Sequence, residues 1–218
     1  MSNAKDAYGR ILKAIITSEL KPGELVGEVQ MAERFGFGRT PVREAIKRLE
    51  NEGFIASSER KKRVYILFPK DIEEIFTLKQ AIESMISAKA SVLGGQSDKE
   101  DMRKLIGEME ALKTESDDEQ FAHKWLDLDA RFHRLLFKMA QNSRAENIID
   151  NLNLQFQRIK LGMMVLEGRV EKAILEHSEI GRAIVAGDSE AASRLMYDHQ
   201  EKVKNTIISL MKTFYHTT

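Results

Sequence analysis

Apolar residues near the amino terminus recur at the spacing expected of two amphipathic helices. The inward residues of the first helix are Ile11, Leu12, Ile15, Ile16 and Leu20. The proline and glycine within 21–23 end this helix. The second, shorter helix is predicted to turn Val29, Ala32 and Phe35 toward the core. It ends at Gly36, a residue type that tolerates the left-handed backbone found after many helices.

A third helix is predicted after a three-residue turn. Thr40 serves as its N-cap, and Pro41 occupies the first helical position, where a missing N–H costs nothing. The buried face is formed by Val42, Ala45, Ile46 and Leu49. Arg43 and Lys47 are four residues apart and therefore share another face, with Arg39 at the entrance of the helix.

Two strand-like runs follow this helix, at 54–57 and 63–68, and Val64 and Ile66 alternate along the second. The charged segment 59–62 predicts a hairpin tip between them. Together with the three helices, this hairpin predicts a winged helix-turn-helix, in which a recognition helix faces base edges and the wing touches the DNA backbone. The alternative is a plain scaffold with an exposed charged helix, because helix–turn–helix units also serve that purpose.

From residue 71 onward the apolar spacing is helical throughout. Six helices are predicted, at about 71–93, 97–114, 117–139, 144–166, 169–186 and 190–214. Six helices without a strand are typical of an antiparallel bundle. The predicted fold class is therefore mostly α, with a winged helix-turn-helix domain over 1–69 and an all-helical effector-binding and dimerisation domain over 70–218.

Composition narrows the class of protein. The chain is 42% hydrophobic and 31% charged, which excludes disordered and collagen-like classes. It contains no cysteine, so disulfides, thiolate metal sites and a cysteine nucleophile are excluded. No apolar run approaches the roughly 18 residues of a spanning helix, and no signal-peptide pattern is present. These features predict a soluble, cytoplasmic protein.

The formal net charge of zero hides an asymmetry between the two predicted domains. Residues 1–68 carry thirteen basic and nine acidic side chains, and the remainder is acidic by the same margin. A basic amino-terminal domain is a hint of nucleic-acid contact. Arginine suits that task because its planar guanidinium can bond two acceptors of guanine at once.

Four residues in the second domain have the chemistry of a metal site. Asp129 and His133 are four apart and share a helix face, while His177 and His199 lie between apolar residues of two other helices. A carboxylate and three imidazoles converging from three helices would bind a divalent transition metal (Zn, Ni or Mn) without a thiolate. The same spacing also fits a local Asp–His ion pair and two hydrogen-bonded core histidines, and both interpretations stand.

The segments LKPGEL at 20–25, GRTPVREAI at 38–46 and LENEGFI at 49–55 resemble the GntR family of bacterial transcriptional regulators. The resemblance implies base contacts by Arg39 and Arg43 and a position close to phosphate for Thr40. Gly38, Val29 and the basic wing tip depart from the family pattern, which leaves the operator preference open. The residues assigned to DNA binding are Arg39, Thr40, Arg43, Lys47, Arg60, Lys61 and Lys62.

The segment DARFH at 129–133, together with Glu176-His177 and the stretch 187–199, resembles the FCD effector domain of the FadR subfamily. In metal-binding members, the positions of Asp129, His133, His177 and His199 are the ligands. Lys79 stands where the subfamily commonly has an arginine facing the effector cavity. Lys79 is therefore predicted to bind effector, and a plain Lys79–Glu83 pair is the alternative.

These inferences predict a homodimeric, metabolite-responsive transcriptional regulator rather than an enzyme. Its partners are a short palindromic operator in double-stranded DNA and a small-molecule effector, a small carboxylate, bound at the metal. One alternative is a metal-free regulator with an acyl-CoA-like effector. Another is a metal-dependent hydrolase, disfavoured because no H-E-x-x-H motif supplies an adjacent general base. The sequence leaves repression and activation equally open.

Overall fold

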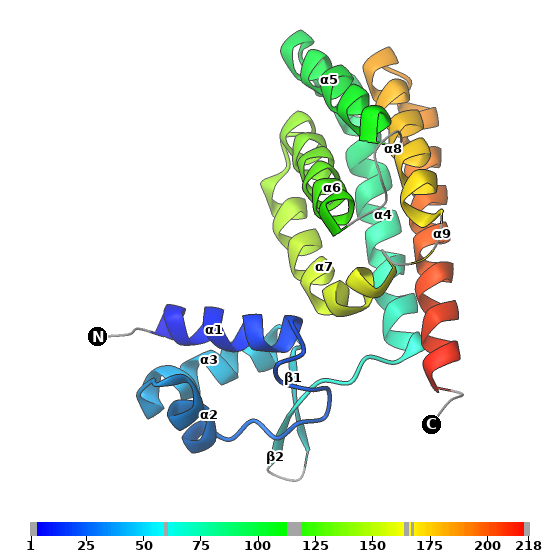
Figure 1. Cartoon of the computed structure of the whole chain (residues 1–218). Coiled ribbons are helices and arrows are strands. Elements are labelled where there is room, and N and C mark those ends of the chain that lie inside the picture. The colour runs from blue at the N-terminus through cyan, green and yellow to red at the C-terminus, as the bar shows by residue number, and fades with distance from the viewer. Residues whose placement is uncertain (1–3, 59–60, 113–118, 164–165, 167, 216–218) are drawn as a thin grey trace. The chain divides into compact units, whose positions relative to one another are not determined.

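The computed structural model describes residues 4–58, 61–112, 119–163, 166 and 168–215. Within these ranges the chain forms nine helices and one two-stranded antiparallel sheet (Figure 1). The elements are α1 (Ala4–Ile16), α2 (Glu28–Phe35), α3 (Arg39–Asn51), β1 (Ile55–Ser58), β2 (Lys61–Val64), α4 (Pro69–Leu93), α5 (Gln96–Leu112), α6 (Glu119–Met139), α7 (Ser143–Met163), α8 (Arg169–Ala186) and α9 (Ser189–Tyr215). The predicted fold class, a winged helix-turn-helix followed by a helical bundle, is confirmed.

The chain divides into two compact units. One comprises Met1–Phe68 with Asn153–Arg158, and the other comprises Pro69–Leu152 with Ile159–Thr218. In the first unit, α1, α2 and α3 enclose an apolar core with the wing strands. Its most deeply buried side chains are Ile11, Leu20, Met31, Val42, Ile46 and Leu49.

The inward face of α2 differs from the prediction. Met31 and Ala32 are buried, whereas Val29 is exposed. On a helix, a residue two positions away points to the opposite side, so the burial of Met31 places Val29 outside. Gly36 follows the helix with φ of 71°, the left-handed conformation that its sequence position predicted.

The recognition helix α3 begins two residues earlier than an N-cap at Thr40 implies. Gly38 is the N-cap residue, and the amide of Val42 donates to the Gly38 carbonyl at 3.3 Å. Thr40 and Pro41 therefore lie inside the first turn. Proline is tolerated anywhere among these first positions because their N–H groups have no partner within the helix, so Pro41 did not define the first residue.

The second wing strand is also displaced from its prediction. β2 spans Lys61–Val64 and pairs with β1 in a register that aligns Ile55 with Val64 and Ser58 with Lys61. Ile66 lies beyond the strand and is exposed. The backbone of segment 23–26 bonds the other edge of β2, which draws the strand toward residues 62–64. Lys61 and Lys62 are therefore strand residues rather than parts of the hairpin tip.

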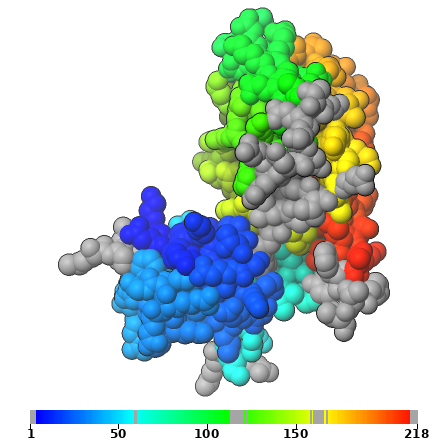
Figure 2. Space-filling view, viewed as in Figure 1, coloured from blue at the N-terminus to red at the C-terminus, as the bar shows by residue number. Residues whose placement is uncertain are grey.

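The described residues of the second unit form the six predicted helices α4 to α9, apart from residues 153–158 of α7, which are grouped with the first unit. α4 is central: it packs against α9, α6 and α8. α5 packs against α6 and α8, and its green side chains lie at the top of the view in Figure 2. Asp188 caps α9 by accepting a hydrogen bond from the amide of Ala191 at 2.9 Å. No described helix is long and apolar enough to cross a membrane.

Candidate nucleic-acid interface and metal centre

The exposed face of α3 gathers the predicted base-contacting residues. Arg39, Thr40, Arg43 and Lys47 are all exposed, while the opposite face of the helix is buried in the core of the first unit. A fourth basic residue, Arg48, contacts other residues of the first unit instead. Its guanidinium lies 3.7 Å from the centre of the Tyr8 ring and bonds Glu52 at 2.8 Å. The exposed face of α3 is therefore basic, and Arg48 is not part of it because it binds Tyr8 and Glu52.

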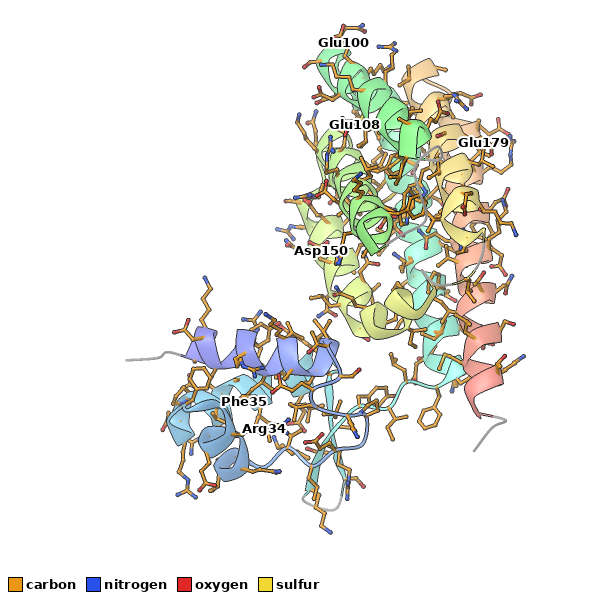
Figure 3. All side chains as sticks on the ribbon, viewed as in Figure 1. Arg34, Phe35, Glu100, Glu108, Asp150 and Glu179 are labelled. Carbon is orange, nitrogen blue, oxygen red and sulfur yellow. The ribbon has the colours of Figure 1, made fainter. Side chains whose placement is uncertain are left out.

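Tyr8 and Arg34 show how the first unit holds its helices. The Tyr8 hydroxyl donates to Glu52 at 2.7 Å, and burial together with this contact raises the pKa of Tyr8 to about 12. Arg34, labelled beside Phe35 in Figure 3, pairs with Glu24 at 2.9 Å. These side chains connect α1, α2 and α3 to neighbouring segments and leave the exposed face of α3 to other partners.

In the described part of the wing, one of the two predicted lysines is paired with a carboxylate. Lys61 is exposed, but the Lys62 ammonium lies 2.6 Å from Glu50, which also accepts a hydrogen bond from Ser57. Lys62 therefore links the wing to α3 rather than offering a free charge to phosphate. Arg63 donates to the Gly23 carbonyl at 2.8 Å. Arg60 lies outside the described residues.

Two kinds of DNA contact are predicted for these residues. We expect Arg43→Ala to lose about 1–3 kcal/mol of binding to the operator that the wild-type protein selects from random sequence, because a base-edge contact is removed. We expect Lys61→Ala to weaken binding to all sequences and to reduce the salt slope by about one. Fluorescence anisotropy with operator and scrambled duplexes over a salt series measures both.

Lys104→Ala on α5 is the matched control, because this lysine is exposed in the other unit and is expected to leave both quantities unchanged. An Arg43→Ala variant that binds the operator as tightly as the wild type would show that α3 is not the recognition helix.

The second unit brings three histidines together in its interior. His133 on α6, His177 on α8 and His199 on α9 each offer a ring nitrogen, and these nitrogens all lie within 4.8 Å of one another. His177 and His199 are buried, and His133 is largely so. Their rings stack edge to face around His177. Three residues separated by up to 66 positions in the chain thus form one cluster.

Two histidines of the cluster have a hydrogen-bond partner at Nδ1. His199 Nδ1 lies 2.7 Å from Glu176, whereas His133 Nδ1 lies 3.1 Å from Glu83 without the geometry of a hydrogen bond. His177 Nδ1 bonds the backbone carbonyl of Ala173 at 2.8 Å. An Nδ1–H held by a carboxylate or carbonyl leaves Nε2 as the lone-pair nitrogen, the arrangement of metal-ligating histidines.

The predicted carboxylate ligand lies beside the imidazoles. Asp129 Oδ1 is 3.2 Å from His177 Nε2 and 3.8 Å from His133 Nε2. Among the described residues, His177 Nε2 is buried without a hydrogen-bond partner. A buried nitrogen in this state is costly, and a metal ion shared with Asp129 and the other two rings would satisfy it. The donor set, one carboxylate oxygen and three imidazole nitrogens, fits a divalent transition metal.

The protonation state of His199 also suits a metal ligand. Burial lowers the pKa of His199 to about 4, despite the raising effect of Glu176, so this ring is neutral near pH 7. Burial raises the pKa of Glu83, but the Lys79 ammonium and His133 outweigh that effect and bring it to about 2. Neutral imidazoles and ionised carboxylates are the forms that bind metal.

Two aromatic rings contact the cluster at His177. Trp125 and Phe132 of α6 contact the His177 ring edge to face, with centroids 5.2 Å and 4.8 Å apart. Apolar rings beside a metal site limit solvent access and strengthen electrostatic interactions there.

The sequence placed the three histidines and Asp129 but missed their outer partners. Glu176 appeared only as the neighbour of His177, and its contact with His199 connects α8 to α9. Glu83 was recognised through Lys79, and that pair is buried: Nζ lies 2.9 Å from Oε2, with 4% and 1% of the side chains exposed. His123 is exposed, and His216 lies outside the described residues.

Comparison with known proteins finds a matching family model for each of the two units. A family model described as "Bacterial regulatory proteins, gntR family" matches residues 3–66, and the FCD domain model matches residues 74–202. The HTH-type transcriptional regulator YdhC of Bacillus subtilis is 25% identical over 197 residues, covering 88% of this chain and 85% of that protein.

Two further proteins are similar over nearly the whole chain. The HTH-type transcriptional repressor RspR of Escherichia coli is 25% identical, covering 92% of this chain and 86% of the repressor. Among solved structures, E. coli McbR/YncC superposes with a TM-score of 0.73 at 16% identity and covers 97% of this chain and 99% of its own. The structural likeness supports the order of the two units along the chain.

Proposed function

We propose that this chain regulates transcription in response to a small carboxylate bound at a divalent metal. The chain belongs to the gntR family of bacterial regulatory proteins and carries an FCD domain. It is a transcriptional regulator with a DNA-binding helix-turn-helix and an effector-binding domain, and it is not an enzyme. The metal-dependent hydrolase considered from the sequence is therefore dropped. The observation that carries the proposal is the buried cluster of three imidazoles beside Asp129.

Asp129, His133, His177 and His199 would hold the ion. A divalent metal there would supply a Lewis-acidic positive charge in a largely buried site, which favours a carboxylate effector. Imidazole suits Zn and Ni, and the carboxylate ligand also admits Mn. Glu176 orients the His199 ring through Nδ1, and Glu83 contacts the His133 ring, so a ligand that enters meets a preformed donor set.

Lys79 is the residue proposed to recognise the effector electrostatically. Its ammonium is already paired with Glu83, so an incoming carboxylate competes for an existing ion pair. Glu83 also contacts His133, and the three side chains form a continuous path toward the metal ligands. Effector binding at Lys79 would thus change the surroundings of one ligand.

DNA binding is proposed to require a homodimer on a short palindromic operator, because two identical recognition helices read two identical half-sites. Regulation then requires the effector to bind one arrangement of the two α3 helices more tightly than another. The name of the RspR repressor supports repression as the output, with effector binding releasing the operator.

The test combines metal analysis with DNA binding. Purified protein is expected to contain close to one divalent metal per chain by elemental analysis. Operator affinity is then measured with a panel of small carboxylates and, as matched controls, their neutral amides. We expect at least one carboxylate, and none of the amides, to change the affinity of metal-loaded protein, and chelation to abolish the response.

An unchanged response after complete metal removal would contradict the metal-dependent mode and favour the metal-free alternative with an acyl-CoA-like effector. Specific operator binding without any response to carboxylates would contradict the effector class while leaving the regulator itself intact.

A further inference from the structure

Glu44 is an acidic residue within the basic face of α3. At about 100° per residue, it lies about 40° around the helix from Thr40 and about 60° from Lys47, and all three side chains are exposed. The buried residues Val42 and Leu49 lie on the opposite side. A surface that the basic face of α3 contacts is therefore also within reach of the Glu44 carboxylate.

The first unit does not neutralise this carboxylate. The carboxylates near the end of α3 each contact a cation: Glu50 contacts a wing lysine at 2.6 Å, and Glu52 contacts Arg48 at 2.8 Å. Arg48 stands four residues after Glu44, the spacing of a favourable helical ion pair, but its guanidinium is held by Glu52. Among the residues that the structure describes, the Glu44 side chain has no ion pair or hydrogen bond.

An unpaired carboxylate on a DNA-facing helix is costly, because a duplex carries one negative phosphate charge per about 1.7 Å of its axis. The cost is offset where the carboxylate accepts a hydrogen bond from a base. Two amino groups donate in the major groove, N6 of adenine and N4 of cytosine. Adenine also presents the N7 acceptor beside N6, which repels a carboxylate, whereas cytosine presents N4 alone. A glutamate on a recognition helix therefore suits cytosine.

We propose that Glu44 selects a cytosine in each half-site of the operator by accepting a hydrogen bond from its N4 amino group. The inference rests on α3 as the recognition helix of the proposed function and adds a second kind of base contact to it. Arg43 donates to guanine, whereas Glu44 accepts from cytosine. At sites without that cytosine, the unmatched carboxylate repels the DNA, so Glu44 also acts against wrong sequences.

Selection of bound duplexes from random sequence tests the base preference. Glu44→Gln is expected to recover the wild-type operator except at one position of each half-site, which changes from cytosine to adenine, because a glutamine amide matches N6 and N7 of adenine. Glu44→Ala is expected to accept any base there. By fluorescence anisotropy, its discrimination against an operator with that base pair replaced is expected to fall about fivefold or more.

N4-methylcytosine at the same position tests the hydrogen bond itself. The methyl group replaces the N4 hydrogen that faces the major groove and leaves the Watson–Crick pair in place. The wild type is expected to bind the methylated operator about fivefold more weakly or worse. Glu44→Ala is expected to bind the methylated and unmethylated operators equally.

Glu33→Gln is the matched control, because Glu33 is an exposed glutamate of α2 and its replacement removes the same charge. It is expected to leave every base preference unchanged. Tighter binding of the Glu44 variants to all sequences, with the wild-type base preferences retained, would overturn the inference, since Glu44 would then act through its charge alone.

Arg43→Ala separates this inference from the function on which it rests. If Arg43→Ala loses selectivity while both Glu44 variants keep the cytosine, the recognition helix stands and the role of Glu44 is wrong. If Arg43→Ala and Glu44→Ala both select the wild-type operator unchanged, α3 is not the recognition helix and both assignments are wrong.

Discussion

Chelation is expected to lower the melting temperature of the wild-type protein and to leave that of His133→Ala nearly unchanged. A ligand that binds only the folded state stabilises it by RT ln(1 + [L]/Kd), about 4 kcal/mol when the free metal is 1,000 times its Kd. His133 lies beside Asp129 and Glu83, so its replacement removes one metal donor and leaves Glu83 without that contact. Thermal unfolding with and without chelator measures the effect.

His123→Ala is the matched control for this prediction. His123 lies on the same helix, α6, but is exposed and distant in phase from His133. Its chelator response is expected to equal that of the wild type. Equal responses in the His133→Ala and His123→Ala variants, or stoichiometric metal retained by a His133→Ala/His177→Ala variant, would contradict the four-ligand site.

Replacing Lys79 by methionine is expected to cost about 3–5 kcal/mol of unfolding free energy, because it leaves the buried Glu83 carboxylate without its cation. Methionine has a similar length and fills the same space, so the effect reports charge rather than a cavity. Restoring neutrality with Lys79→Met/Glu83→Gln is expected to recover most of the loss. Urea denaturation of chelator-treated protein gives the comparison without a contribution from metal.

Lys70→Met provides the control for this second prediction. Lys70 and Glu74 have the same spacing on the same helix, but they are exposed and 3.7 Å apart. Exposed pairs contribute about 0–1 kcal/mol, so this variant is expected to unfold nearly as the wild type does. A Lys79→Met variant as stable as Lys70→Met would show that Glu83 does not depend on Lys79.

Local patterns predicted much of the fold. The helical spacing identified all six helices of the described bundle, and Arg169–Ala186 matches its predicted bounds. Gly187 ends that helix with φ of 78°, and Asp188 caps the next. These features depend on residues within a few positions of one another, so they can be read without knowledge of distant contacts.

The predictions were wrong where a local sequence pattern is compatible with more than one local structure. Pro41 fits several positions of a first helical turn, and the Gly38 N-cap uses no side-chain hydrogen bond that a sequence pattern could reveal. The alternation of Val64 and Ile66 suggested a longer strand, but the backbone of residues 23–26 decided where β2 forms. Val29 followed the helical period, and the phase of α2 was decided by the core around Met31.

The sequence by itself determined which residue types lie on which helix, and so the presence of three inward histidines with a carboxylate four residues before one of them. Only the tertiary structure decided how they are held. Glu83 contacts His133, which is 50 positions away in the sequence, and Glu176 of α8 contacts His199 of α9. Lys62 contacts Glu50. Periodicity reports the direction of a side chain relative to its own helix axis, but a contact depends on the distance and rotation between elements, which the packing of the whole unit sets.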